Sequence, residues 1–397
     1  MKSKLNSQEF IERVGYYQVN GSNIRYDNKW DAMLLASALK TNYSWQFAPE
    51  VFSKINWTIP IETSLDELYR RRLQQLRDEY DYLTLFFSGG KDSLNILMTS
   101  IKNKILIDEI VVYYPFVMES KFNNKDTSSD NLYSEVEFAA KTFLRDNEHL
   151  LDKRTKIRFQ DNGELNAKFL EYDDWFDRVR PANTLQLVSP TYASTLDPHF
   201  INLAMQGKHT AIITGADKPF ITEKDDGFYF TFMDAGFNTI TRPRSAETKS
   251  LFNENVNFEA FYHTPFMPEL VVKQAQVAAA AYNTDSRLRN LVPNPHDPNV
   301  IHVISEKERI IAQYIYSDGL NPWQTLKHKK DLVRGGERAV WQTLSNKVKD
   351  NYTNVLKDVV NKIDPRFFTK GNYVFGPAPC FSKSYFIQSA TYKEFIK

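Results

Sequence analysis

Three short runs of apolar, strand-forming residues stand out along the chain, and each is continuous rather than alternating. They cover residues 82–87, 109–114 and 210–214. Continuous runs of this length are typical of strands that are buried on both faces of a parallel sheet. A weaker strand pattern covers residues 156–159. These four segments predict the strands of one buried sheet.

An amphipathic helix is predicted directly before the first of these runs, at residues 65–79. Its leucines, at positions 65, 68, 73 and 76, lie close to a spacing of three and four residues, and Ser64 with Glu67 forms a capping-box pattern at its start. Four arginines belong to this helix, and we interpret them as its solvated face. They are Arg70, Arg71, Arg72 and Arg77.

Helical spacing of apolar residues also fills the intervals between the predicted strands. The segments concerned are residues 94–101, 134–145 and 198–206. Strands that alternate with helices in this way predict an α/β fold with a doubly wound, Rossmann-like parallel sheet.

The pattern changes on both sides of this α/β stretch. Residues 1–62 predict a small mixed element with short strands at 16–19 and 24–26, and residues 63–250 hold the predicted sheet. From residue 251 to residue 397 the strand signals fade and helical spacing dominates. The helices expected there are residues 268–282, 305–316, 321–332 and 337–358. We therefore expect three regions, with a mainly helical C-terminal region packed over the site.

The composition of the chain excludes some classes of protein but does not indicate a function. Hydrophobic residues make up 42% of the chain and charged residues 25%, which is ordinary for a globular protein. The net charge of +1 argues against a protein that coats nucleic acid or an acidic membrane. No segment has the roughly 20 apolar residues of a membrane-spanning helix, and the N-terminal residues lack a signal-peptide pattern. We therefore expect a cytoplasmic protein without a membrane partner.

The candidate chemistry lies where the first strand meets the next helix, in the sequence Ser88-Gly89-Gly90-Lys91-Asp92-Ser93. The glycines permit positive φ and let backbone N–H groups converge on phosphate oxygens. The helix adds its partly positive N-terminus, and Lys91 and the two serines add donors. Asp92 suits such an anion site mainly as a ligand of Mg²⁺. A Walker A loop is excluded because its glycine spacing is different.

This loop resembles the pyrophosphate loop, Ser-Gly-Gly-x-Asp-Ser, of the N-type ATP pyrophosphatases. Within that superfamily the chain is most similar to the synthase domain of asparagine synthases, over roughly residues 62–250. The similarity also includes residues 68–73 before the loop strand and Gly215-Ala216-Asp217 after the last one. It implies an adenine nucleotide alpha hydrolase-like fold that cleaves ATP between its α and β phosphates, with ATP and Mg²⁺ bound.

The resemblance also implies roles for individual residues. The residues that would bind ATP and its pyrophosphate are Ser88, Gly89, Gly90, Lys91, Asp92, Ser93 and Gly215. The backbone of Val112 and Tyr113 would contact adenine, and Asp92 and Asp217 would hold Mg²⁺. The catalytic candidates are Lys91, Asp92 and Lys218.

The chain departs from the asparagine synthases at two points. Their glutaminase domain begins with a cysteine nucleophile, whereas residue 2 here is Lys2 and the single cysteine is Cys380. We therefore expect no built-in glutaminase, so nitrogen would come from free ammonia, an amine or a separate glutaminase partner. Lys218 replaces the family's glutamate, which puts aspartate as the acceptor in doubt and offers a positive charge for pyrophosphate. One cysteine also argues against the sulfur-transferring relatives.

The expected function is an AMP- and pyrophosphate-forming ligase that adenylates a small-molecule acceptor and then forms a C–N bond. Two alternatives stay open. The basic run Lys327-His328-Lys329-Lys330 would suit an enzyme that adenylates a nucleobase in RNA or DNA. A chain without catalytic activity would instead be an ATP-binding module that regulates a partner.

Overall fold

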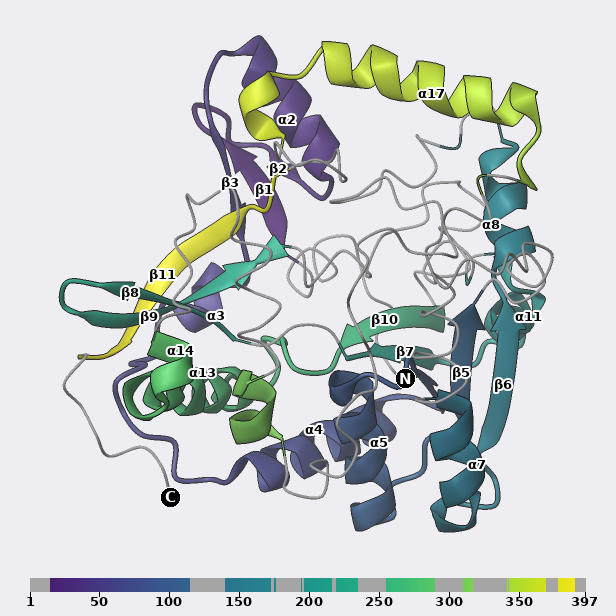
Figure 1. The fold of residues 1–397 in the computed structure, drawn as a ribbon, viewed down its shortest axis with the longest axis vertical. Helices are drawn as coiled ribbons and strands as arrows, with labels where there is room; N and C mark the ends of the chain where they lie inside the picture. The colour runs from purple at the N-terminus through teal and green to yellow at the C-terminus, as the bar shows by residue number, and fades with distance from the viewer. Residues whose placement is uncertain are drawn as a thin grey trace.

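The computed structural model describes the chain in eleven stretches, and its strands form three sheets (Figure 1). The described residues are 15–114, 140–172, 175, 194, 196–215, 219–234, 255–289, 310–316, 341, 343–368 and 378–389. One sheet has five strands and is parallel throughout, and the other two are antiparallel with three strands each. The predicted α/β class with a parallel sheet is therefore confirmed.

The parallel sheet has the strand order β10-β7-β4-β5-β6. Its strands are β4 (Tyr82–Phe86), β5 (Glu109–Tyr114), β6 (Lys156–Asp161), β7 (Thr210–Thr214) and β10 (Val256–Ala260). Along the chain, β5 and β6 add to one side of β4, and β7 and β10 then add to the other side. The order therefore reverses between β4 and β7. Open α/β sheets bind ligands at the carboxyl ends of the strands at such a reversal.

Helices cover both faces of this sheet. They include α4 (Leu65–Glu79), α5 (Lys91–Asn103) and α11 (Pro198–Met205). Arg72 of α4 bonds Glu259 of β10 at 2.8 Å, and His199 of α11 lies 3.1 Å from Glu109 of β5. The strand register places these two carboxylates on opposite faces. Layers of helix thus lie on either side of the strands, as in Rossmann-like folds.

All four predicted strands and the helix at 65–79 are found at or within two residues of their expected positions. The Ser64 hydroxyl accepts the Glu67 N–H at 3.3 Å, as the capping pattern predicts. The prediction that the four arginines form a solvated face is only partly correct. The Arg71 side chain is 52% exposed, whereas that of Arg72 is 1% exposed and ion-paired with Glu259.

Two strands lie in the region where the strand signals of the sequence fade. They are β10 and a later strand, β11 (Phe381–Gln388). β10 has the sequence Val-Asn-Phe-Glu-Ala, so its buried polar residues interrupt the apolar run that marks a buried strand. β11 pairs with β9 (Gly227–Met233), and β9 forms a hairpin with β8 (Phe220–Lys224). The division into three separate regions stays a prediction.

Residues 16–52 form a small group of short strands and helices. Its parts are β1 (Tyr16–Val19), β2 (Arg25–Tyr26), α2 (Lys29–Ala38), β3 (Tyr43–Gln46) and α3 (Pro49–Phe52). A buried ion pair of 2.7 Å joins Lys29 to Asp234 at the end of β9, and the Tyr17 hydroxyl bonds the same carboxylate at 2.9 Å. This group is therefore fastened to the β8-β9-β11 sheet.

The core is continuous from the parallel sheet to α13 (Pro268–Thr284), a helix that packs against α4 and the β8-β9-β11 sheet. Its run of alanines at 278–281 is buried, which lets the helix approach its neighbours closely. Further helical segments are α7 (Phe143–Asn147), η3 (Glu148–Leu150), α8 (Gly163–Leu170), α14 (Ser286–Arg289), α17 (Asn346–Asn361) and η6 (Pro365–Phe367).

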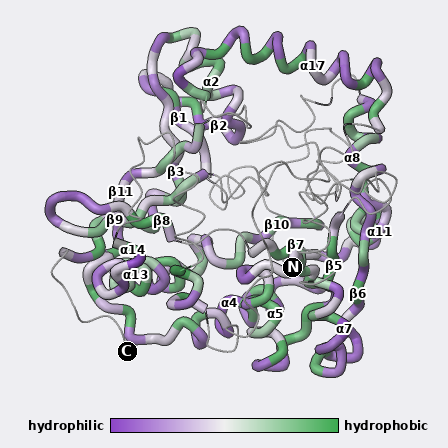
Figure 2. The backbone as a smooth tube through the Cα atoms, viewed as in Figure 1, coloured by the Kyte–Doolittle hydropathy of each residue, from purple (hydrophilic) through white to green (hydrophobic). Residues whose placement is uncertain are grey.

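α17 lies at the molecular surface, where hydrophilic and hydrophobic residues alternate along its length (Figure 2). The predicted helix at 268–282 is confirmed by α13, and that at 337–358 in part by α17. The one at 321–332 lies outside the described residues. Within the described part of the chain, no helix has both the length and the apolarity to cross a membrane.

Candidate functional site

The Ser-Gly-Gly-Lys-Asp-Ser loop connects the carboxyl end of β4 to the first turn of α5. Gly89 has a φ of +67°, a left-handed conformation that glycine adopts without strain. Gly90 is the N-cap of α5 and has no side chain to bond the first N–H groups of the helix. Such a helix start favours an anion, because Gly90 supplies no side-chain cap to the partly positive N-terminus. The predicted strand–loop–helix arrangement is therefore present.

The two serines of the loop make bonds within it. The Ser88 hydroxyl accepts the Gly90 N–H at 3.3 Å, and the Ser93 hydroxyl donates to the Gly90 carbonyl at 3.1 Å. Ser88 is exposed, whereas Ser93 is buried. Ser93 thus shapes the loop in this state, and Ser88 is the serine that faces solvent.

Gly215, at the carboxyl end of β7, packs directly against this loop. A Cβ on Gly215 would lie 2.9 Å from both the carbonyl carbon of Asp92 and the amide nitrogen of Ser93. Real Cβ atoms do not approach backbone this closely, so the second motif needs glycine for space. The structure places Gly215, the one described residue of the second motif, beside the loop at the point where the strand order reverses. Asp217 and Lys218, the next predicted site residues, lie outside the described residues.

Asp92 is held by two tyrosines that the sequence analysis did not single out. The Tyr262 hydroxyl donates to the Asp92 backbone carbonyl at 2.7 Å, and the Tyr316 hydroxyl donates to the Asp92 carboxylate. Asn95 of α5 in turn donates to the Tyr262 hydroxyl at 3.1 Å. No local pattern marks these tyrosines, because they lie 170 and 224 residues from Asp92 along the chain.

The end of β5 lies beside the loop, as expected for an adenine-binding edge. The Val111 carbonyl accepts the Phe87 N–H at 2.9 Å, so the backbone of Val111 faces β4. Backbone direction alternates along a strand, so Tyr113 faces the same side, beyond the end of β4, whereas Val112 faces β6. Of the two predicted residues, Tyr113 is therefore the one whose backbone faces the side of β4, and its contact with adenine stays a prediction.

A buried polar network holds the Tyr113 side chain in place. Arg158 donates to Glu109 and to Asp197, both at 2.6 Å, and the Tyr113 hydroxyl donates to Asp197 at 2.6 Å. Burial would raise the pKa of Glu109, but the hydrogen bond from His199 and the charge of Arg158 outweigh it and lower that pKa. Burial and the nearby Asp197 raise the pKa of Tyr113, which keeps its hydroxyl protonated.

The described residues could bind Mg²⁺ only at a site where substrate phosphates supply some of the metal ligands. Within the described stretches, no group of three or more His, Cys, Asp or Glu side chains could hold a metal ion. Mg²⁺ commonly takes one or two protein carboxylates and fills its remaining positions with phosphates and water. Asp92, in the first turn of α5, suits that role. Its predicted partner Asp217 lies outside the described residues.

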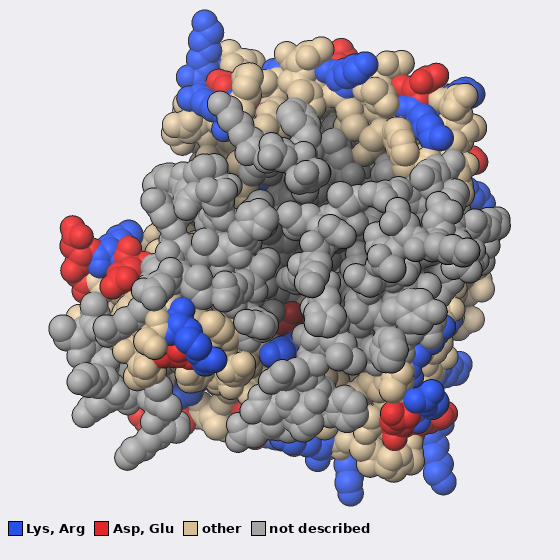
Figure 3. Space-filling model, in the orientation of Figure 1, with Lys and Arg blue, Asp and Glu red and all other residues tan. Residues whose placement is uncertain are grey.

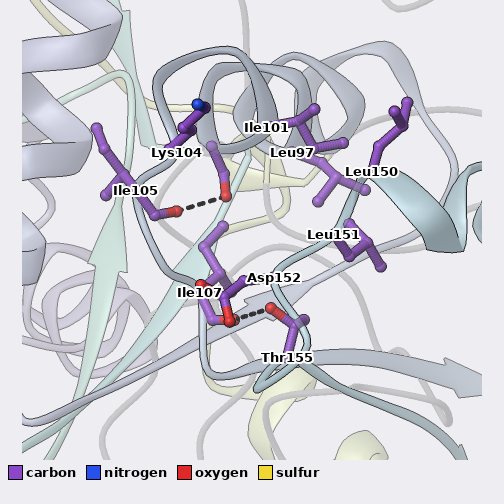
Figure 4. A pocket seen from close by; sticks show the side chains of 10 residues that line it. Leu97, Ile101, Lys104, Ile105, Ile107, Leu150, Leu151, Asp152 and Thr155 are labelled. Atoms are coloured by element: carbon purple, nitrogen blue, oxygen red, sulfur yellow. Dashed lines mark hydrogen bonds between the residues drawn. The ribbon is translucent and has the colours of Figure 1, made fainter.

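A cavity of about 240 Å³ lies at the other end of α5 and is separate from the loop (Figure 4). It is lined largely by aliphatic side chains, including Leu97, Ile101 and Leu151, with Lys104 and Asp152 among its polar residues. The loop is at the N-terminus of α5, whereas this cavity is at the C-terminus. It is therefore not the predicted nucleotide site.

Charged side chains of both signs are interspersed around the visible rim of the molecule (Figure 3). The basic run at 327–330, on which the nucleic-acid alternative depends, lies outside the described residues. That alternative therefore stays a prediction.

A comparison with protein-family models finds no family that matches the chain, and a comparison with curated proteins finds no significant match. The resemblance to the N-type ATP pyrophosphatases rests on the motif residues described above.

Proposed function

We propose that the chain is an ATP-dependent enzyme that forms AMP and pyrophosphate, of the kind represented by the synthase domain of asparagine synthases. The observation that carries this proposal is the position of the Ser88–Ser93 loop. It follows the central strand of a parallel sheet, opens a helix, and packs against Gly215 at the reversal of strand order. Nucleotides bind at this point in sheets of this kind.

The proposed arrangement assigns each part of ATP to residues of the loop or of its neighbours. The backbone around Gly89 and Gly90, with Ser88 and Lys91, would hold the β and γ phosphates of ATP. The Tyr113 backbone would meet the adenine edge. Asp92 would bind Mg²⁺, which supplies positive charge to the phosphates and the leaving pyrophosphate.

The proposed reaction has two steps. An oxygen of the acceptor attacks the α phosphorus, the bond from that phosphorus to the bridging oxygen breaks, and pyrophosphate leaves. Ammonia or an amine then attacks the activated carbon of the acceptor, and AMP leaves as the C–N bond forms. Lys91 and Lys218 are the candidates to stabilise the negative charge that moves onto pyrophosphate.

Pyrophosphate release tests the proposal. The full chain would be incubated with ATP and Mg²⁺ against amino acids, other carboxylates, ammonia and bulk RNA. Asp92→Ala and Ser93→Ala should each lower the release by about 10²-fold or more, because they remove a metal ligand and a loop-shaping hydroxyl.

Ser100→Ala is the matched control for Ser93→Ala. Ser100 is a second buried serine of α5, and its hydroxyl bonds the Ile105 carbonyl at 2.6 Å, far from the loop. This variant should keep most of the activity. If both loop variants release pyrophosphate near the wild-type rate, the assignment of the loop as the active site is wrong.

A further inference from the structure

The Asp92 residue is held at two points by phenols that come from different parts of the chain. Tyr262 follows the edge strand β10 and bonds the Asp92 backbone carbonyl at 2.7 Å. Tyr316 ends the segment 310–316 and bonds the Asp92 carboxylate. The rings of the two tyrosines are 5.6 Å apart and tilted by 40°. Backbone and side chain of the loop aspartate are thus fixed by one aromatic cluster.

The segment 310–316 is itself firmly anchored. The Tyr69 hydroxyl of α4 donates to the Ile315 carbonyl at 2.5 Å and accepts a bond from Gln274 of α13 at 3.0 Å. On the other side of the segment, the Tyr314 hydroxyl donates to Asp285 at 2.9 Å. These bonds connect two core helices to the residue before Tyr316, so the position of the Tyr316 hydroxyl is set by the core.

Both phenols are buried hydrogen-bond donors. Tyr262 and Tyr316 are 0% and 5% exposed, and each hydroxyl donates to an oxygen of Asp92. A protonated phenol that donates to one carboxylate oxygen fixes the plane of the carboxylate. The direction in which the other oxygen points is then fixed as well.

We infer that Tyr316 is a positioning residue for the nucleotide site, which orients the Asp92 carboxylate toward the Mg²⁺ ion that accompanies ATP. The segment 310–316 is then part of the site although it lies more than 200 residues from the loop along the chain. The inference rests on the proposed function, because it assigns Asp92 to Mg²⁺. Outer groups that orient metal ligands affect metal affinity by roughly 10- to 100-fold.

The test separates metal-dependent from metal-independent nucleotide binding. Calorimetric titration of the full chain would use the ATP analogue with a methylene group between the α and β phosphates, which cannot be cleaved there. Each protein would be titrated with Mg²⁺ and again with EDTA. Tyr316→Phe should weaken binding about tenfold with Mg²⁺ and leave binding with EDTA unchanged, because the hydroxyl acts through the metal ligand.

Tyr314→Phe is the matched control. It removes a phenol–carboxylate bond from the same segment, two residues away, without touching Asp92. It should bind the analogue as the wild type does under both conditions. In an Asp92→Asn background, Tyr316→Phe should cause no further loss, since the two residues act together.

The possible results are distinct. Wild-type affinity of Tyr316→Phe with Mg²⁺, or an equal loss with and without Mg²⁺, would overturn the positioning role while leaving ATP binding intact. Failure of the wild-type chain to bind the analogue would instead overturn the proposed function, and this inference with it. Thermal unfolding of each variant shows whether a loss of affinity reflects loss of the fold.

Discussion

The backbone of Gly215 lies against the backbone of Ser93, so close that a Cβ on Gly215 would be 2.9 Å from the Ser93 nitrogen. Gly215 directly follows β7, and Ser93 lies in the first turn of α5. This contact places the first residue of the second sequence motif against the loop. The requirement at position 215 is for space, since Gly215 is not among the glycines with positive φ.

Gly215→Ala should therefore disturb the loop. The added methyl group must push the first turn of α5 away, which displaces the groups proposed to hold pyrophosphate. We expect pyrophosphate release to fall at least about tenfold, because small displacements of a site cost large factors in rate. The free energy of unfolding should drop by about 1–3 kcal/mol from overpacking.

Gly207→Ala is the control for this prediction. Gly207 has a φ of +68° and open space around it, so alanine there costs about 1 kcal/mol of backbone strain without a clash. Both variants lose stability, and only Gly215→Ala should lose activity. Equal activity in the two variants would show that the loop tolerates a side chain at position 215.

The buried pair Arg72–Glu259 should matter strongly for stability. The two side chains are 1% and 5% exposed, and the Tyr80 hydroxyl also donates to Glu259 at 2.5 Å. Arg72→Met leaves a buried carboxylate without its cation, so we expect a loss of about 3–5 kcal/mol in urea unfolding. Arg71→Met, on the exposed side of the same helix, should leave the unfolding midpoint near that of the wild type. Similar midpoints for the two variants would contradict this account.

His263 should make the fold sensitive to mild acid. Burial, only partly opposed by the charge of Asp92, lowers the pKa of His263 from 6.5 to about 4. Between these values the unfolded chain binds a proton that the folded chain does not, so stability falls as the pH falls. From pH 6.5 to pH 5 the loss due to this residue is about 1.5 kcal/mol.

Urea unfolding of the wild type and of His263→Gln across pH 5 to 7 measures how much His263 contributes to the pH dependence of stability. The variant removes the titrating group, so its stability should change less with pH over that interval. The pKa of Glu109 is lowered from 4.5, so its contribution is lost only at lower pH. A variant with the same slope as the wild type would show that another group is responsible.

The central strands could be predicted because a local run of apolar residues indicates that they are buried. Thr210–Thr214 is buried at every position and contains a continuous apolar stretch. Val256–Ala260 is equally buried but contains Asn257 and Glu259, and the ion pair that makes Glu259 tolerable comes from α4. The hairpin strand Gly227–Met233 pairs with Phe381–Gln388, some 150 residues later, and no local pattern encodes that pairing.

The candidate site, like the fold, could be predicted from the sequence only in part. The Ser88–Ser93 loop was found because its chemistry is contiguous, and the position of Gly215 beside it follows from parallel strands meeting at one edge. The tyrosines on Asp92 could not be found, because only the tertiary fold brings residues 262 and 316 to residue 92. Arg72 was misjudged for the same reason, since its partner lies 187 residues away.

The most direct test of the central claim is the identity of the nucleotide product. ATP labelled at the α phosphate would be incubated with the full chain, Mg²⁺ and the panel of acceptors and amines, and AMP would be resolved from ADP. The account predicts labelled AMP with an equal amount of pyrophosphate, lost in Asp92→Ala. Labelled ADP with free phosphate would contradict cleavage between the α and β phosphates.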